Sequence, residues 1–267
     1  MVDECSLNRA RSDVEVAINI WRGLLGEFDN VELAYIKGSS IKAWDSPIDY
    51  VPVVSDIDLH IKTEKGKPLL PVNGEGFSRS LKINSLYQER FIEVNPNHLH
   101  IPRIQVVTME ELKPEWIPNN LADILALYGD INPGRVRTVS EVRSEDLLNL
   151  MGIETVLEGL PLRMIDRIGL EYYRILRQLC WRVSPAPYRL LSQELDPEEV
   201  WRLNRTRVTR KLDDEGYTET AEHYRRYYLS CWDTFKKEFR DDESMRKAIK
   251  DAYSLLSTVY HHVKKLE

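Results

Sequence analysis

Two aspartates lie inside a run of alternating apolar residues, and this feature restricts the fold of the chain more than any other. Residues 56–62 read DIDLHIK, and their strict alternation predicts a β-strand. Side chains at i and i+2 point to the same face of a strand, so Asp56 and Asp58 project side by side. The apolar residues between them point the other way, into a core. Aspartate is depleted in strands and is seldom buried without a partner, so something must compensate the two charges.

A divalent cation is the simplest compensation for this pair. Two adjacent carboxylates repel each other unless a cation lies between them or one of them takes up a proton. Mg²⁺ prefers oxygen ligands and is usually completed by water and substrate phosphates. Two metal ions that share such carboxylates can activate an attacking oxygen and stabilise a leaving oxygen in phosphoryl transfer. Asp56 and Asp58 are therefore predicted to be metal ligands.

A Gly-Ser-Ser turn precedes the aspartates and offers the complementary half of such a site. Gly38, Ser39 and Ser40 follow a predicted strand at 31–36 and lead into a predicted short helix, SIKAW. Glycine lets the backbone approach a phosphate closely, and the amides of a turn entering a helix bind anions. Serine hydroxyls add further donors. We expect this turn to bind the phosphates of a nucleotide.

The order of these motifs, YIKGSS followed by SDIDLHI, resembles the nucleotidyltransferase superfamily of DNA polymerase beta and kanamycin nucleotidyltransferase. The resemblance covers residues 31–112 directly, and the helical remainder looks like the bundle that many small-molecule members carry. It implies magnesium-dependent transfer of a nucleoside monophosphate from a triphosphate, such as ATP, to a hydroxyl acceptor, with release of pyrophosphate. It also implies that Gly38 and Ser39 contact the phosphates and that Asp56 and Asp58 ligate the metal.

The chain departs from the family pattern at two places. The gap of sixteen residues between Ser39 and Asp56 is longer than the family usually shows, so KAWDSPIDYVPVV (42–54) is expected to contain an inserted loop. Asp45 and Asp49 within it are interpreted as loop caps. The segment IPRIQVV (101–107), a third predicted strand, offers arginine and glutamine where polymerase-like members carry a third carboxylate.

The missing third acid leaves the general base open. Kanamycin-type members take a glutamate base from a helix of the bundle, and Glu171 in GLEYYRIL is the nearest candidate. The alternative is an ordinary helix-surface acid paired with Arg167 or Arg174. Further candidates lie near the third strand: Glu93, Glu110 and Glu111.

A basic segment, RLNRTRVTRK (202–211), offers a second contact for a triphosphate. On one helix Arg202, Arg205 and Arg210 would share a broad face, with Lys211 near it. Arg205 and Lys211 are therefore candidate nucleotide-binding residues. A plain solvated helix explains the same pattern equally well.

The periodicity along the chain predicts an α+β protein with two domains. Helical patterns alternate with the three strands in a catalytic domain at 1–138, whereas 139–267 is helical almost throughout and suggests an antiparallel bundle. The helical patterns lie at 13–28, 78–94, 162–182, from 196, 218–239 and 244–266.

Composition limits the cellular setting and the partners. The 267 residues contain no apolar run long enough to span a membrane and no apolar core of a signal peptide near the N-terminus, which predicts a cytoplasmic protein. The net charge of −6 argues against a nucleic-acid partner, so a small molecule or a protein side chain is the expected acceptor. Monomer and homodimer both remain open. Two alternatives also stay open: a catalytically silent nucleotide-binding or interaction protein, and a protein-modifying enzyme of toxin–antitoxin type.

Overall fold

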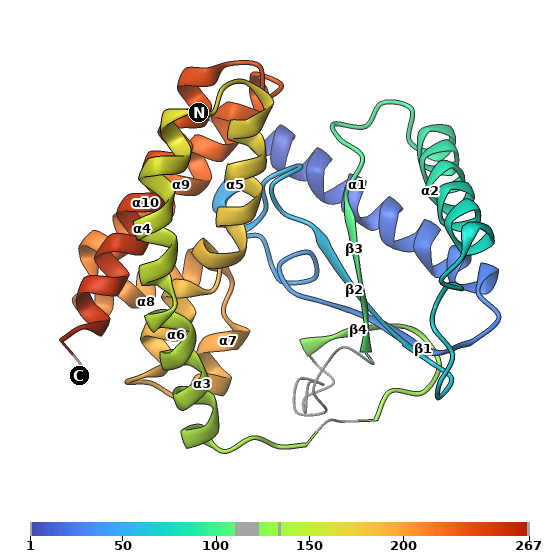
Figure 1. The fold of residues 1–267 in the computed structure, drawn as a ribbon, viewed down its shortest axis with the longest axis horizontal. Coiled ribbons are helices and arrows are strands. Elements are labelled where there is room, and N and C mark those ends of the chain that lie inside the picture. The colour runs from blue at the N-terminus through green and yellow to red at the C-terminus, as the bar shows by residue number, and fades with distance from the viewer. Residues whose placement is uncertain (1, 110–122, 133–134, 266–267) are drawn as a thin grey trace. The chain divides into compact units, whose positions relative to one another are not determined.

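The structure, a computed structural model, describes residues 2–109, 123–132 and 135–265 (Figure 1). The chain divides into two compact units. Unit 1 comprises residues 1–42 and 55–136, and unit 2 comprises residues 43–54 and 137–267. Two of the candidate bases, Glu110 and Glu111, lie outside the described residues.

Unit 1 is built on a four-stranded mixed sheet with the order β3-β2-β1-β4. β1 pairs antiparallel with both β2 and β4, and β2 pairs parallel with β3. The three strands expected from the alternation are confirmed, and one further strand joins the sheet beside β1. The strands are β1 (Val31–Lys37), β2 (Ile57–Thr63), β3 (Ile104–Thr108) and β4 (Leu125–Tyr128).

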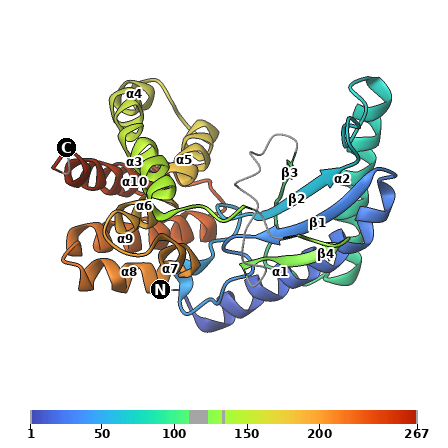
Figure 2. The same ribbon diagram turned by 90° about the horizontal axis from the view of Figure 1, so that it is seen from below.

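Two long helices of unit 1, α1 and α2, lie next to the sheet in both views (Figures 1 and 2). α1 (Glu4–Leu24) continues into a short 3-10 helix, η1 (Leu25–Glu27), and α2 (Gly74–Val94) packs on α1. The rings of Trp21 and Tyr87 meet between the two helices, with centroids 5.9 Å apart. Ile57, Leu59 and Ile61 of β2 are completely buried. The prediction that they point into a core is confirmed.

The described part of unit 2 is helical, so the chain as a whole is an α+β protein, as predicted. α10 packs against α9 and α5, and α6 packs against α3 and α7. Asp196 caps α7 with Pro197 at the first helical position, which confirms the helix start read from the sequence. The helices are α3 (Val139–Met151), α4 (Ile153–Ile165), α5 (Leu170–Val183), α6 (Ala186–Ser192), α7 (Pro197–Arg202), α8 (Arg205–Asp214), α9 (Thr218–Lys236) and α10 (Asp242–Val263).

The inserted segment 43–54 belongs to the helical unit. Its 3-10 helix η2 (Pro47–Asp49) packs on α8 and α9, and the indole of Trp232 donates to the carbonyl oxygen of Pro47 at 2.7 Å. The buried carboxylate of Asp49 accepts from the backbone amides of Asp45 (2.8 Å), Ser46 (2.9 Å) and Thr206 (2.9 Å). Asp49 is therefore a cap, as expected. The segment that contains it packs on α8 and α9 and does not project as a free loop.

Two helical expectations that involve candidate site residues are wrong. The segment SIKAW does not form a helix, because the chain after Gly38 makes a turn in which the Ile41 amide donates to the Gly38 carbonyl oxygen at 3.4 Å. Residues 202–211 are not one helix either. α7 ends at Arg202, and Asn204 caps α8 by accepting from the amide of Arg207.

No helix in the described parts of the chain is both long enough and apolar enough to span a lipid bilayer.

Candidate active site

The Gly38 turn lies directly against the carboxylate of Asp58. β1 ends at Lys37, and Gly38 then adopts φ +92°, a conformation that side-chain-bearing residues rarely take. A Cβ atom at Gly38 would lie 2.7 Å from Oδ2 of Asp58. Both the backbone conformation and this close approach favour glycine. The first half of the predicted site therefore meets the second half within unit 1.

The sheet register fixes which residues surround Asp58. Asp58 is opposite Lys37 on β1 and beside Gln105 on β3, so the three residues form one row across the sheet. Asp56 immediately precedes β2 and points to the same face, and both aspartates are half-buried. β3 therefore contributes an amide, and not a carboxylate, beside Asp58 in this row.

Two cations compensate the aspartate pair. A guanidinium nitrogen of Arg103 lies 2.5 Å from Oδ2 of Asp56, and the carbonyl oxygen of Arg103 accepts from the Ile57 amide at 3.0 Å. Burial lowers the pKa of Lys37, and the negative charge of Asp58 opposes that shift. The unfavourable charges inside the strand are thus offset by neighbours on β1 and just before β3.

An aromatic pair forms the next row of the same face. Tyr35 and His60 are register partners on β1 and β2. Their rings stack with centroids 5.1 Å apart and an interplanar angle of 4°. Burial, together with the charge of Lys37, lowers the pKa of His60 to about 3, so His60 is neutral at pH 7. Burial also raises the pKa of Tyr35 to about 12. Within the described residues, the Tyr35 hydroxyl and His60 Nδ1 have no hydrogen-bond partner.

The residues of this face fit a magnesium site that is completed by a substrate. Mg²⁺ is commonly held by one or two carboxylates together with water and phosphate oxygens, and Asp56 and Asp58 supply two carboxylates. The approach of the Gly38 turn to Asp58 places backbone that can contact phosphate beside one of them. Among the described residues, no group of three or more His, Cys, Asp or Glu side chains could hold a metal by itself. A metal here would therefore depend on ligands from the nucleotide.

The two serines of the turn differ in exposure. Ser39 is partly exposed, whereas Ser40 is buried and its hydroxyl has no hydrogen-bond partner within the described residues. An unpartnered buried hydroxyl is costly, and Ser40 is the serine of the turn that carries one.

Glu171 lies in unit 2, in the first turn of α5. Its carboxylate is 3.5 Å from a guanidinium nitrogen of Arg174, one helical turn away. This ion pair is the one expected if Glu171 is an ordinary helix-surface acid and not a general base. The assignment of Glu171 as general base stays a prediction.

Arg205 is a core residue of unit 2, and we withdraw it from the nucleotide-binding set. Its guanidinium donates to the carbonyl oxygens of Ile48 and Asp49, each at 3.1 Å, and lies 4.1 Å from the ring centroid of Tyr228. Only 5% of the residue is exposed. The helix break at Leu203 and Asn204 removes the shared face on which the sequence interpretation depended.

Lys211 is an exposed residue near the end of α8. Its ammonium pairs with the carboxylate of Glu215 at 2.7 Å, which raises the pKa of Lys211. An ion pair of this kind on a helix surface explains the residue without a ligand.

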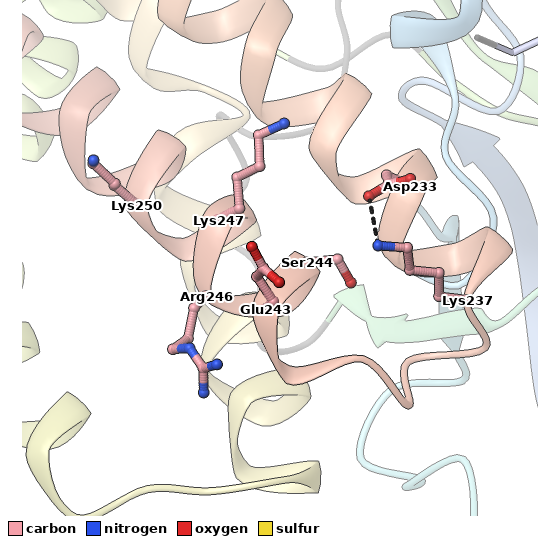
Figure 3. A pocket seen from close by; sticks show the side chains of 7 residues that line it. All are labelled: Asp233, Lys237, Glu243, Ser244, Arg246, Lys247 and Lys250. Atoms are coloured by element: carbon pink, nitrogen blue, oxygen red, sulfur yellow. Dashed lines mark ion pairs between the residues drawn. The ribbon is translucent and has the colours of Figure 1, made fainter.

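A separate hollow of about 490 Å³ lies on unit 2 between α9 and α10 (Figure 3). Lys237 on its rim is paired with Asp233 at 3.4 Å and with Asp241 at 2.7 Å. The hollow thus has a mixed, solvated lining, and we assign no function to it. It is lined by Asp233, Lys237, Glu243, Ser244, Arg246, Lys247 and Lys250.

Sequence reasoning did not find the cations of the site. Lys37 adjoins the Gly-Ser turn, but its position opposite Asp58 follows from the antiparallel register, which a single sequence does not specify. The sequence marks Arg103 only as one of two residues, with Gln105, at a place where an acid is expected. The signal that could have found both is the charge of the aspartate pair, which requires nearby cations.

Comparisons with known protein families, with curated protein sequences and with solved structures find no match to this chain.

Proposed function

We propose that the protein is a magnesium-dependent nucleotidyltransferase that moves a nucleoside monophosphate from a nucleoside triphosphate to a hydroxyl acceptor and releases pyrophosphate. The observation that carries the proposal is the contact between the two motifs. The left-handed turn at Gly38 lies so close to Asp58 that a Cβ atom at position 38 would lie 2.7 Å from Oδ2 of that carboxylate and would displace it. A turn that can contact phosphate and a pair of metal-binding carboxylates on one sheet face are the two parts that such a reaction needs.

In this proposal Asp56 and Asp58 hold Mg²⁺. The ion would neutralise charge on the phosphates and on the leaving pyrophosphate. The backbone of Gly38 and Ser39 and the hydroxyl of Ser40 contact phosphate oxygens. Hydrogen bonds from donors fixed before the reaction act without reorganisation when charge moves to the leaving group.

The Tyr35 and His60 pair supports the rigidity of this face. Both rings are buried, and both stay neutral at pH 7 because burial disfavours their charged forms. A stacked neutral pair in the row next to Asp58 fills this face of the sheet without adding charge. The acceptor is a small molecule or a protein side chain, in keeping with the net charge of −6.

A transfer assay tests the proposal. The protein is incubated with Mg²⁺, each of four α-labelled nucleoside triphosphates and cell extract, and labelled products are sought. We expect label transfer with wild type and none with Asp58→Asn. If Glu171 is the base, Glu171→Gln keeps nucleotide binding but lowers transfer by about a hundredfold or more. Unchanged transfer in Glu171→Gln would send the search to Glu93, Glu110 and Glu111.

A second candidate is a silent relative that binds nucleotide without turnover. It is favoured by the row in which Gln105 stands beside Asp58, because an amide cannot take a proton from an acceptor hydroxyl. Under this alternative, wild type binds triphosphate with Mg²⁺, yet no component of any extract becomes labelled.

A further inference from the structure

Arg103 is held beside Asp56 by the backbone of the sheet as well as by its side chain. The carbonyl oxygen of Arg103 accepts the Ile57 amide at 3.0 Å, which fixes the arginine next to the start of β2. From this position its guanidinium reaches Oδ2 of Asp56 at 2.5 Å. The pair joins one of the proposed metal ligands to a cation that the chain itself supplies.

The guanidinium and a metal ion compete for the same carboxylate. A divalent cation at Asp56 would repel the nearby positive charge of Arg103, and an oxygen that binds the metal has less electron density to offer a second cation. Metal binding at Asp56 therefore weakens the pair between Asp56 and Arg103 and favours movement of the guanidinium to another anion.

The arginine side chain is free to make that movement, whereas its backbone is not. The side chain of Arg103 is 43% exposed, compared with 16% for Asp56. A guanidinium that leaves Asp56 needs another anionic partner, and its planar fork of donors matches phosphate oxygens. The triphosphate that brings the metal also brings that partner.

We infer that Arg103 is an exchangeable counter-ion, paired with Asp56 in the metal-free protein and with a phosphate of the nucleotide once metal is bound. This inference rests on the proposed function, because it assumes a metal–triphosphate at Asp56 and Asp58. It gives a role to the arginine that precedes β3 and lies beside the first aspartate of the pair. It also predicts effects of opposite sign on two ligands when the arginine is removed.

The experiment measures two affinities separately. Mn²⁺ serves as the probe of the metal site in the absence of nucleotide, because it takes the same oxygen ligands as Mg²⁺ and its free concentration is read by electron paramagnetic resonance. ATP with excess Mg²⁺ is the second ligand, titrated by calorimetry. The variants are Arg103→Gln, Arg103→Lys and, as a control, Arg90→Gln. Arg90 is an exposed arginine of α2 that lies 3.9 Å from Glu27.

Loss of the guanidinium should strengthen Mn²⁺ binding and weaken ATP binding. We expect Arg103→Gln to raise Mn²⁺ affinity about threefold, the effect of removing a partly exposed competing cation. It should lower ATP affinity about tenfold, because a charge-assisted hydrogen bond to phosphate is lost. Arg103→Lys keeps the charge, so its Mn²⁺ affinity should stay near that of wild type. Arg90→Gln should change neither affinity.

The outcomes separate this inference from the proposed function. If wild type binds Mn²⁺ and ATP but Arg103→Gln leaves Mn²⁺ affinity unchanged or lowers it, the counter-ion role is refuted and the nucleotide site stands. If Arg103→Gln raises Mn²⁺ affinity but ATP affinity does not fall, the exchange to phosphate is refuted. If wild type binds neither ligand, both the inference and the proposed function fail. Circular dichroism of each variant shows whether the fold is intact.

Discussion

At the scale of single residues, the proposed site depends on how closely Gly38 approaches Asp58. An L-residue in the left-handed region costs about 1 kcal/mol. A side chain at position 38 would also displace Oδ2 of Asp58, which it would meet at 2.7 Å. Because that oxygen ends a short rotatable side chain, the carboxylate can turn aside while the fold survives. The requirement for glycine is therefore tied to the position of the carboxylate.

A matched pair of alanine substitutions separates the two effects. Gly38 and Gly66 both have positive φ, +92° and +76°, but a Cβ at Gly66 would meet no atom within 4 Å. Gly38→Ala and Gly66→Ala should each lose about 1 kcal/mol of unfolding free energy from backbone strain. Only Gly38→Ala should weaken binding of Mg²⁺ and ATP, by about tenfold or more. Equal binding by the two variants would mean that Gly38 is merely a structural turn.

The sequence predicted the two aspartates on one strand face, but it did not predict their neighbours. Period-two alternation suffices for the first, because it depends only on local geometry. The cations at Lys37 and Arg103 are brought in by pairing between strands that are distant along the chain. The misassigned Arg205 illustrates the reverse error. Its basic neighbours suggested a cationic surface, whereas Arg205 is buried and donates to the carbonyl oxygens of Ile48 and Asp49.

At the scale of elements, Asp49 attaches the inserted segment to α8. Its carboxylate accepts three backbone amides and the Thr206 hydroxyl at 2.7 Å, and the residue is 1% exposed. Asp49→Ala should lower the unfolding free energy by about 3 kcal/mol, because several buried donors lose their acceptor. Denaturant unfolding followed by tryptophan fluorescence measures this loss.

Asp45 provides the control for this prediction, since it belongs to the same segment. Its carboxylate pairs with Arg207 at 2.8 Å, and the side chains of Asp45 and Arg207 are 27% and 55% exposed. Asp45→Ala should cost no more than about 1 kcal/mol. Equal losses for Asp45→Ala and Asp49→Ala would show that the segment is not anchored through the Asp49 cap.

A buried pair in unit 1 ties α1 to the segment before β3 and should make stability depend on pH. The Asp13 carboxylate accepts from His100 Nδ1 (2.9 Å) and from the backbone amides of Leu99 and His100. Burial lowers the pKa of His100 below its ordinary value, an effect that Asp13 opposes and the charge of His98 reinforces. The unfolded state therefore binds more protons as pH falls through the ordinary histidine range, and stability falls with it.

His100→Gln tests the sign of this effect, because glutamine keeps a donor for Asp13 but does not titrate. The advantage of wild type over His100→Gln in unfolding free energy should be larger at pH 7 than at pH 5. An advantage that grows toward pH 5 would mean that the folded protein favours the charged histidine, contrary to the direction of the pKa shift.

Sequence periodicity predicted the long helices and strands but missed short elements and a helix break. The long helices of both units and three strands were predicted because each has a sustained period. β4 spans only Leu125–Tyr128 and was missed, since four residues carry little periodicity. The single helix expected at 162–182 is divided, because α4 ends at Ile165 and Gly169 takes positive φ before α5 begins. Apolar residues continue across that break, so the pattern did not reveal it.

At the scale of the whole molecule, the chain combines a sheet unit, which carries the candidate site, with a helical unit. The sequence of the sheet unit is interrupted by residues 43–54, which belong to the helical unit. Each unit contains buried apolar residues. The proposed chemistry assigns nucleotide and metal to unit 1 and leaves the acceptor and base to be found. The central claim is therefore a claim about unit 1: that Asp56 and Asp58 bind a metal–triphosphate.

Thermal unfolding with and without Mg²⁺ and ATP tests that claim most directly. A ligand at a hundredfold excess over its dissociation constant stabilises the folded state by about 2.7 kcal/mol, which raises the melting temperature measurably. We predict this rise for wild type and for the control Asp29→Asn with Glu64→Gln, which changes the same charge at exposed positions of unit 1. Asp56→Asn with Asp58→Asn should show no rise. A double variant at Asp56 and Asp58 that responds to Mg²⁺ and ATP as wild type does would contradict the account.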